Sequence, residues 1–268
     1  MAASLGRLLR DRGKASQLGA CVLSYQEADS TNDLALTLAR QDAPHGAVVL
    51  ADTQSAGRGR WKREWSSLEG GLYMSVLLRP PPEKEPSITL LPAAASVAAA
   101  EAIVEASGLK PLLRWPNDLL LERRKVGGIL CEASFSGERP DFVVAGFGIN
   151  VNQAREDFPE ELQTVATSLK IETGRAQDRM LVAACLTERL EFWWERCFEK
   201  SPDILRAWEE RAWGEAGMRV RVQDKEGEEF EATTFGLAED GGLKVRLPDG
   251  RIQTLYSEDV HFLRGIDE

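Results

Sequence analysis

The chain has 268 residues, 43% of them hydrophobic and 28% charged, and a formal net charge of -10. This composition is typical of a globular protein with one large domain or two unequal ones, and the acidic balance argues against general nucleic-acid binding, which needs dense positive charge. Four cysteines without C-x-x-C spacing and only two histidines argue against a zinc cluster and against triad catalysis.

The start of the chain and its apolar segments predict a cytoplasmic protein that does not enter a membrane. Residues 1–14 alternate apolar with charged side chains, so they lack the continuous apolar centre of a secretory signal. The longest apolar segment, Ala93–Ala106, is short for a membrane span and is interrupted by Ser96, Glu101 and Glu105.

Helices and strands alternate in the first part of the chain. The expected elements are a helix over Ser4–Asp11, a strand over Ala20–Tyr25, a helix capped by Asp29–Asp33, a buried strand over Gly46–Ala51, a strand over Leu72–Leu78 and an alanine-rich helix over Ser87–Ser107. Gly108 follows the last helix and is a typical helix end.

Four more strands and then two helices are expected in the second part. The strands are expected at Leu112–Trp115, Leu119–Glu122, Gly128–Phe135 and Phe142–Gly146, and the helices at Asp178–Phe198 and Pro202–Trp213. Consecutive strands beside one long helix predict an α+β fold.

The segment from Gly217 to Glu268 differs from the rest and is expected to form a second domain. Turn residues at Asp224–Gly227, Asp240–Gly242 and Pro248–Gly250 separate short strand patterns, which predicts a small β-barrel. The segment holds 7 Lys and Arg against 12 Asp and Glu, so half of the net charge lies in it. We therefore expect one domain over residues 1–216 and another over residues 217–268.

A basic segment with glycines lies between two of the expected strands. Residues 57–63 contain two glycines and four basic side chains, Arg58, Arg60, Lys62 and Arg63, without an acid. Glycine lets the backbone approach a ligand, and arginine can hold two oxygens of a carboxylate or phosphate at once. The segment therefore predicts a site for a small anion, most simply one that carries phosphate.

Three other segments place polar or charged residues beside glycines or prolines where strands meet loops. They are Arg114–Asp118, Lys125–Leu130 and Gly146–Asn152. Each also has a purely structural interpretation: Gly146–Gly148 could mark close strand packing, Asn117–Asp118 a plain turn, and Lys125 a solvated hairpin tip. Ser30–Asn32 could likewise be a helix N-cap.

Taken together and in chain order, these segments resemble biotin protein ligases, which activate biotin with ATP and attach it to a lysine of a carrier protein. The shared segments are Ser30–Asn32, Gln54 with Gly57–Arg60, Trp65, Leu72–Ser75, Trp115–Asp118, Lys125–Leu130 and Gly146–Asn150. The resemblance is close over residues 25–152, whereas the tail from Gly217 agrees only in size and strand pattern.

The resemblance implies a fold and a partner. The catalytic domain would hold a mixed β-sheet of the class II synthetase-like or biotin–lipoate ligase type, and the C-terminal domain would be a small SH3-like β-barrel. The acceptor would be a lysine of a biotin carboxyl carrier protein, as in acetyl-CoA carboxylase, and Mg²⁺ would accompany ATP.

The resemblance also implies two groups of site residues. On the biotin side are Ser30, Thr31, Asn32, Gln54, Gly57, Arg58, Lys125, Gly127, Gly128, Leu130 and Gly146. On the nucleotide side are Arg60, Arg63, Trp65, Asn117, Asp118, Lys125 and Asn150, with Trp65 stacked on adenine and Asp118 as the Mg²⁺ ligand. Lys125 and Arg60 would be catalytic, because biotin's carboxylate must approach the α-phosphate of ATP and cations cancel the repulsion between these two anions.

Two positions of the loop depart from the usual family pattern. Lys62 stands where a glycine is common, and Leu68 stands where a proline is common. The lysine could stiffen the loop or add a phosphate contact, which leaves the mobility of the loop in doubt. Neither departure falls on a position assigned to direct ligand contact.

Three alternatives stay open at this point. A bifunctional ligase and transcriptional repressor is disfavoured, because fewer residues precede Ser30 than a DNA-binding winged helix needs, so no DNA binding is expected. A lipoate ligase is disfavoured because its Arg-Arg-x-x-Gly-Gly-Gly motif is absent. An adenine-nucleotide-binding module without enzymatic activity is the third alternative. A homodimer could form through edge strands, but no residue requires it.

Overall fold

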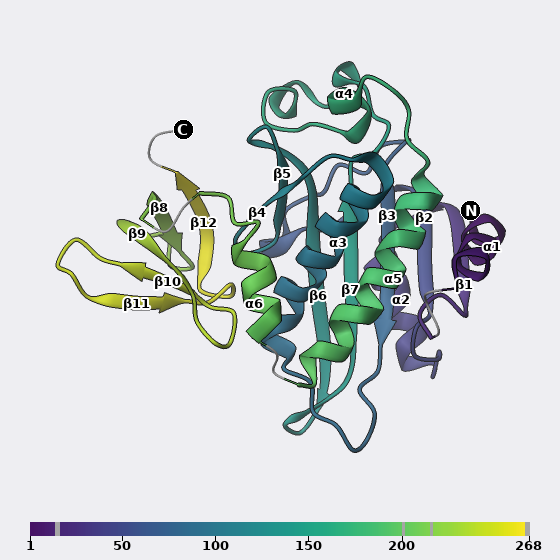
Figure 1. The fold of residues 1–268 in the computed structure, drawn as a ribbon, viewed down its shortest axis with the longest axis horizontal. Coiled ribbons are helices and arrows are strands. Elements are labelled where there is room, and N and C mark those ends of the chain that lie inside the picture. Colours follow the sequence, from purple (N-terminus) through teal and green to yellow (C-terminus); the bar gives the residue numbers. More distant parts are fainter. Residues whose placement is uncertain (14–16, 200–201, 215–216, 266–268) are drawn as a thin grey trace.

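The computed structural model describes residues 1–13, 17–199, 202–214 and 217–265, with side chains described as far as Val260. Figure 1 shows a larger body that contains most helices and, beside it, a small domain of strands. The helices are α1 (Ala2–Arg12), α2 (Thr31–Arg40), α3 (Leu91–Ser107), α4 (Leu169–Thr173), α5 (Arg179–Cys197) and α6 (Pro202–Glu209), with short 3-10 turns at Arg60–Lys62, Ile88–Leu90, Arg155–Asp157 and Glu160–Leu162.

The larger body is built on a seven-stranded mixed sheet. Its strands are β1 (Val22–Ala28), β2 (Val48–Gln54), β3 (Leu72–Leu78), β4 (Leu112–Arg114), β5 (Asp118–Leu121), β6 (Arg124–Ser136) and β7 (Arg139–Ile149). The order across the sheet is β1-β2-β3-β7-β6-β5-β4, in which β1 and β2 are parallel and every other pair is antiparallel. The predicted α+β fold with a mixed sheet is confirmed.

Helices cover the two faces of this sheet unequally. Helices α3 and α5 pack on one face, where the apolar side chains of the strands join them in one continuous core (Figure 1). On the opposite face, α2 buries Ala35 and Ala39 against Val49, Leu77 and Val144. Because α2 has ten residues, it covers only part of that face, and the ends of β6 and β7 stay open to a ligand.

The small domain is an antiparallel sheet of five strands. They are β8 (Arg219–Asp224), β9 (Glu229–Leu237), β10 (Leu243–Arg246), β11 (Ile252–Leu255) and β12 (Val260–Gly265), in the order β11-β10-β9-β8-β12. The turns expected at 224–227, 240–242 and 248–250 lie between successive strands, as predicted.

Some predicted boundaries are wrong, for identifiable reasons. β6 begins four residues earlier than expected and β7 extends three residues beyond Gly146, because the glycine-containing motifs lie inside these strands rather than in loops. Helix α6 ends at Glu209 rather than Trp213. The residues after α6 leave the helix because Leu113 of β4 donates to the Arg211 carbonyl at 2.7 Å and accepts from the Trp213 amide at 2.7 Å.

One described helix, Ile88–Ser107, is long and apolar enough to span a membrane by length and composition, which the sequence patterns did not predict. Most of its side chains are buried against the sheet and α5, and Ala94, Ala95, Val97 and Ala98 have no exposed surface. The apolar character of this helix is therefore accounted for by its place in the core.

Candidate active site

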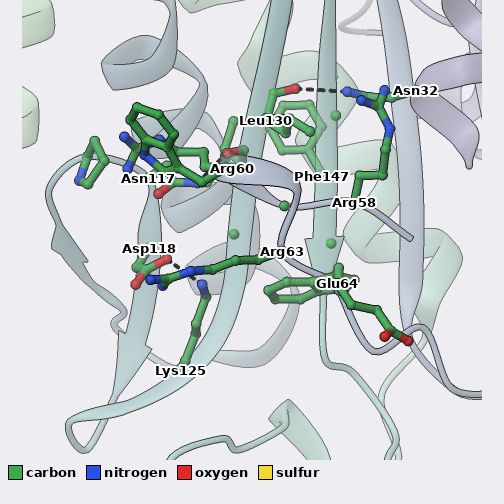
Figure 2. A pocket seen from close by; sticks show the side chains of 18 of the residues that line it. Asn32, Arg58, Arg60, Arg63, Glu64, Asn117, Asp118, Lys125, Leu130 and Phe147 are labelled. Atoms are coloured by element: carbon green, nitrogen blue, oxygen red, sulfur yellow. Dashed lines mark hydrogen bonds and ion pairs between the residues drawn. The ribbon is translucent and has the colours of Figure 1, made fainter. Parts of the chain in front are cut away.

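A cavity of about 260 Å³ lies on the face of the sheet that α2 only partly covers. Fourteen of the predicted site residues line it: Ser30, Thr31, Asn32, Gln54, Arg58, Arg60, Arg63, Trp65, Asn117, Asp118, Lys125, Gly128, Leu130 and Gly146. Segments separated by more than a hundred residues thus meet in one place, and Figure 2 shows their side chains around the cavity.

Neutral polar groups form one end of the cavity, at the start of α2. Gln54 Oε1 accepts from the Thr31 amide at 2.8 Å and from Thr31 Oγ1 at 3.1 Å. The buried hydroxyl of Ser75 donates to Asn32 Oδ1 at 2.6 Å. The Ser30 side chain accepts a hydrogen bond from the Asp33 amide and thereby caps α2. Ser30 also lines the cavity, so the same residue serves the helix and the site. These hydrogen bonds hold several short polar side chains in fixed positions.

Glycines on two adjacent strands make the floor of the cavity flat. Gly128 of β6 lies directly opposite Gly148 of β7, and the indole of Trp65 rests on both. A Cβ at Gly148 would come within 2.6 Å of that ring. The Trp65 Nε1 atom is buried and has no hydrogen-bond partner among the described residues. This nitrogen lies against Gly148 on the floor and not in the open part of the cavity, so the ring presents its aromatic surface to the cavity.

The segment Gly57–Trp65, called the basic hairpin below, folds over this floor. The Trp65 amide donates to the Gly57 carbonyl at 2.9 Å, and the Gly59 amide donates to the Arg63 carbonyl at 2.8 Å. Trp61 and Lys62 at its tip have φ values of 56° and 57°, in the left-handed region that favours glycine. The departure noted at Lys62 therefore falls on a position where a glycine would be less strained.

Arg58 and Arg63 of the hairpin point to opposite ends of the cavity (Figure 2). Arg58 makes ion pairs with Asp33 at 2.6 Å and Glu132 at 2.9 Å, at the end of the cavity near Asn32 (Figure 2). Arg63 extends toward Asp118 and Lys125 at the other end (Figure 2). The charge of Arg58 is thus already compensated by carboxylates, whereas Arg63 lies where an anion would meet several cations.

Arg60 connects the hairpin to the small domain. It donates to the carbonyl oxygens of Ser257 and Val260, the second at 3.0 Å, and Trp61 Nε1 donates to the Val260 carbonyl at 2.9 Å. Burial, with a smaller contribution from Arg63, lowers the pKa of Arg60 to about 10, although Asp118 and Glu258 act to raise it. Arg60 stays protonated at neutral pH, so it brings a partly buried positive charge to the cavity.

A carboxylate between two cations forms the charged end of the cavity. Arg114, Asp118 and Lys125, called the Asp118 cluster below, come from the neighbouring strands β4, β5 and β6. Asp118 accepts from Arg114 at 2.8 Å and from Lys125 at 2.5 Å, through different oxygens. Burial alone would raise the pKa of Asp118, but Lys125 and then Arg114 outweigh it, so the pKa lies below its ordinary value.

Lys125 is not in a hairpin tip, as one interpretation of the sequence had it. The tip is formed by Glu122 and Arg123, which have positive φ values, and Lys125 lies inside β6. Its ammonium group also lies 5.1 Å from the centre of the Trp65 ring. The strand therefore fixes the position of this cation inside the cavity.

The described residues do not fit the prediction that Asp118 binds Mg²⁺. Both carboxylate oxygens of Asp118 are already paired with cations. Within the described ranges, no group of three or more His, Cys, Asp or Glu side chains could hold a metal ion. Because both of its oxygens already hold cationic side chains, we assign no metal to this carboxylate.

Three predicted site residues do not line the cavity: Gly57, Gly127 and Asn150. Asn150 is buried and its side-chain amide donates to the Thr167 carbonyl at 3.0 Å, which fixes the segment just before α4. A Cβ at Gly57 would lie 2.4 Å from Ser67 Oγ, which makes this glycine necessary for the base of the hairpin. Gly127 faces Leu119 on the other side of β6.

Sequence reasoning missed several lining residues, namely Gly59, Trp61, Glu64, Arg114, Trp115, Pro116, Ile129, Phe147, Gly148 and Val260. Most of them lie within or beside the predicted motifs. Arg114 heads one such motif, and its pairing with Asp118 follows from the register of β4 and β5. Val260 belongs to the second domain, and no pattern in the sequence connects it to the hairpin.

Comparisons with known proteins agree with this geometry. Residues 23–150 match the model of the "Biotin/lipoate A/B protein ligase family", and residues 217–263 match the "Biotin protein ligase C terminal domain". The chain is 36% identical to the bifunctional ligase/repressor BirA of Bacillus subtilis, over 95% of this chain and 81% of that protein. It is 34% identical to the biotin–[acetyl-CoA-carboxylase] ligase of Paracoccus denitrificans, over 87% of this chain and 97% of that protein.

A solved structure shows the same arrangement of elements. The biotin protein ligase of Aquifex aeolicus in complex with biotin and ATP superimposes with a TM-score of 0.78 at 31% identity. The match covers 92% of this chain and 99% of that one.

Replacing Gly146 with alanine is expected to damage the neutral end of the cavity. A Cβ there would lie 2.0 Å from Asn32 Oδ1, so the Asn32 amide would have to leave its bond with Ser75. We expect calorimetry with biotin, the ligand that the resemblance implies, to show affinity reduced by about tenfold or more. Gly59→Ala is the control, because its Cβ would meet only Arg63 O, at 3.5 Å. Equal affinity in both variants would contradict the placement of this ligand beside Asn32.

Asp118 is expected to stabilise the fold in a pH-dependent way. Its pKa in the folded chain is below the ordinary value of 3.8, so its contribution is complete well above pH 3.8 and is lost as the pH falls from there toward the folded pKa. We expect Asp118→Asn to lower the free energy of unfolding at pH 7 by about 1–3 kcal/mol. Urea unfolding at a series of pH values should show this difference shrink at acidic pH. A difference in the free energy of unfolding that does not change with pH would show that the negative charge of Asp118 does not stabilise the fold.

Proposed function

The chain belongs to the biotin/lipoate A/B protein ligase family as a biotin–[acetyl-CoA-carboxylase] ligase, and on this basis we propose how its residues divide the reaction between them. The proposal is carried by one observation: a cavity with a neutral, hydrogen-bonding end and a cationic end around Asp118. The neutral end would bind the rings of biotin, and the cationic end would bring its carboxylate and ATP together.

The start of α2 is suited to the ureido group of biotin. This flat group carries one carbonyl oxygen and two N–H groups, so it needs both donors and acceptors at fixed positions. Thr31, Asn32 and Gln54 supply them from a hydrogen-bonded network that is largely buried. Because that network is already ordered, little conformational entropy would be lost on binding.

The opposite end is suited to anions. Lys125, Arg60 and Arg63 line it, and the floor of glycines lets the Trp65 ring lie close to the strands. Trp65 supplies an aromatic face for the nucleotide. Lys125 lies at this end beside Asp118, where it would contact the biotin carboxylate and the α-phosphate together.

The reaction then needs no nucleophile from the protein. In the first step, a carboxylate oxygen of biotin attacks the α-phosphorus, the bond to the β-phosphate oxygen breaks, and pyrophosphate leaves with the electron pair. In the second step, the amine of the carrier lysine attacks the acyl carbon of biotinyl-5′-AMP, loses a proton, and AMP leaves. The contribution of the cavity is positioning and stabilisation of the negative charge that develops on the phosphate.

Several finer assignments belong to this proposal. Mg²⁺ would arrive complexed with the ATP phosphates, because it keeps most of its waters and uses few protein ligands. The acceptor would be the biotin carboxyl carrier domain of acetyl-CoA carboxylase, and the enzyme would work in the cytoplasm without DNA or membrane. The domain boundary would lie between residues 216 and 217, which the start of the second family match supports.

The C-terminal domain would complete the nucleotide side of the cavity. Arg60 binds two of its carbonyl oxygens through Nη2, and Arg60 also lines the cavity. The C-terminal domain would thereby fix the orientation of this guanidinium group and leave its other nitrogens available for phosphate.

Lys125→Ala is expected to slow adenylation by roughly 10²–10³-fold, as removal of a preorganised donor to a developing charge typically does. Biotin-dependent exchange of pyrophosphate into ATP measures this step without the carrier. Lys110→Ala is the control, since Lys110 is exposed and does not line the cavity. Near-normal exchange in Lys125→Ala would contradict its proposed role, and exchange driven by lipoate instead of biotin would contradict the substrate.

Trp61→Phe is expected to raise the KM for ATP by about two- to tenfold, the usual effect of losing one net hydrogen bond, with little effect on the KM for biotin. The variant removes the bond from Trp61 Nε1 to Val260 and so loosens the contact between the hairpin and the C-terminal domain. Trp193→Phe is the matched control, because its indole bonds to Glu101 in the α3–α5 interface. An unchanged KM for ATP would mean that this contact does not shape the nucleotide side.

A further inference from the structure

The Asp118 cluster contains a charged residue, Arg114, for which the reaction outlined above has no role. Arg114 and Asp118 are directly opposite each other on β4 and β5, with Arg114 Nη2 2.8 Å from Asp118 Oδ2. Lys125 Nζ lies 2.5 Å from the other oxygen, Oδ1. The carboxylate is the least exposed of the three side chains, at 15%, against 22% for Arg114 and 34% for Lys125.

This arrangement poses an energetic problem for Lys125. To contact the anions of the ligands, its ammonium group has to turn away from Asp118 or share its charge with them. A buried carboxylate that loses its partner is strongly destabilised, because its attraction to the partner no longer offsets the cost of desolvation. With Lys125 as its sole partner, Asp118 would therefore hold this lysine back from the ligand.

Arg114 removes this obstacle because its ion pair with Asp118 does not involve Lys125. Its guanidinium group approaches a different carboxylate oxygen, and it also packs over Trp213, with 5.7 Å from Arg114 Cζ to the ring centre. Trp213 is itself fixed to β4 by its amide bond to Leu113. Arg114 is thus held from two sides.

We propose that Arg114 is a positioning residue for adenylation: it keeps Asp118 paired while Lys125 turns from Asp118 to the carboxylate and phosphate of the ligands. The inference rests on the proposed function of Lys125. It separates two tasks within the cluster, since Lys125 contacts the reacting groups and Arg114 acts through Asp118.

Other charges near Asp118 do not duplicate this task. Arg60 is held by the carbonyl oxygens of the C-terminal domain, and Arg63 extends from the basic hairpin rather than from the sheet (Figure 2). The pKa of Asp118 supports the assignment, because it is lowered by Lys125 and by Arg114 despite burial. A carboxylate with this environment stays ionised at neutral pH and needs a lasting partner.

A double-mutant cycle tests the proposal. We expect Arg114→Gln to reduce the single-turnover rate of biotinyl-5′-AMP formation by about tenfold or more, because Asp118 then holds Lys125. Arg114→Lys, which keeps the charge, should restore most of the lost rate. In the Asp118→Asn background there is no carboxylate to hold Lys125, so adding Arg114→Gln should cause little further loss.

A direct contact between Arg114 and the ligand would give the opposite result: Arg114→Gln would then cost as much in the Asp118→Asn background as in the natural chain. That outcome, or a normal rate for Arg114→Gln, would overturn the proposal. The comparison within the Asp118→Asn background remains available if Arg114→Gln alone does not fold.

Two controls separate the proposal from simpler explanations. Trp213→Leu removes one of the two contacts that hold Arg114 but leaves the ion pair, so its adenylation rate should fall by less than that of Arg114→Gln. Lys125→Ala distinguishes a failure of the proposed role of Arg114 from a failure of the proposed role of Lys125. If Lys125→Ala is inactive and Arg114→Gln is normal, only the inference about Arg114 fails; if Lys125→Ala is active, the proposed function of Lys125 fails.

Discussion

The pairing of Asp118 with cations from neighbouring strands is the interaction on which the rest of the site depends. A cavity that is to bind a carboxylate and a triphosphate needs several positive charges close together. Two like unit charges about 4 Å apart repel by about 4 kcal/mol at an effective dielectric constant of 20, so such a group is unfavourable without a counter-charge. Asp118 supplies that counter-charge between Arg114 and Lys125, and anionic ligands would take over part of its role.

The architecture of the sheet explains why the site lies where it does. Helix α2 covers one part of its face and presents Ser30, Thr31 and Asn32 at its start, while the glycines of β6 and β7 leave the remaining part flat. The basic hairpin follows β2 and folds back over this floor, and the C-terminal domain meets the tip of the hairpin at Val260. Each of these elements contributes one side of the cavity.

Much of the fold and of the site could be predicted from local patterns. The apolar run Leu72–Leu78 forms the strand expected of it, and motifs in family order correctly indicated residues that meet in one cavity. Gly127 and Asn150 were assigned to the site from the family resemblance, and neither lines the cavity. In a strand, neighbouring side chains point to opposite faces, so Gly128 faces the cavity while Gly127 does not.

The remaining errors concern contacts between distant segments. Residues 210–213 continue a helical pattern but pair with β4 instead, which no local signal indicates. The bonds from Arg60 to the C-terminal domain depend on how the two domains come together. By contrast, Asp118 pairs with Arg114 only four residues before it, across β4 and β5, and with Lys125 of β6. These pairs explain why a carboxylate assigned to a metal from the resemblance holds cationic side chains instead.

The most direct measurement of the central claim is a crystal structure of this protein with biotin and a non-hydrolysable ATP analogue. The account predicts that Lys125 Nζ leaves Asp118 and contacts the biotin carboxylate and the α-phosphate, while Arg114 remains paired with Asp118. A complex in which both ligands are bound and Lys125 is still paired with Asp118, away from their oxygens, would contradict it.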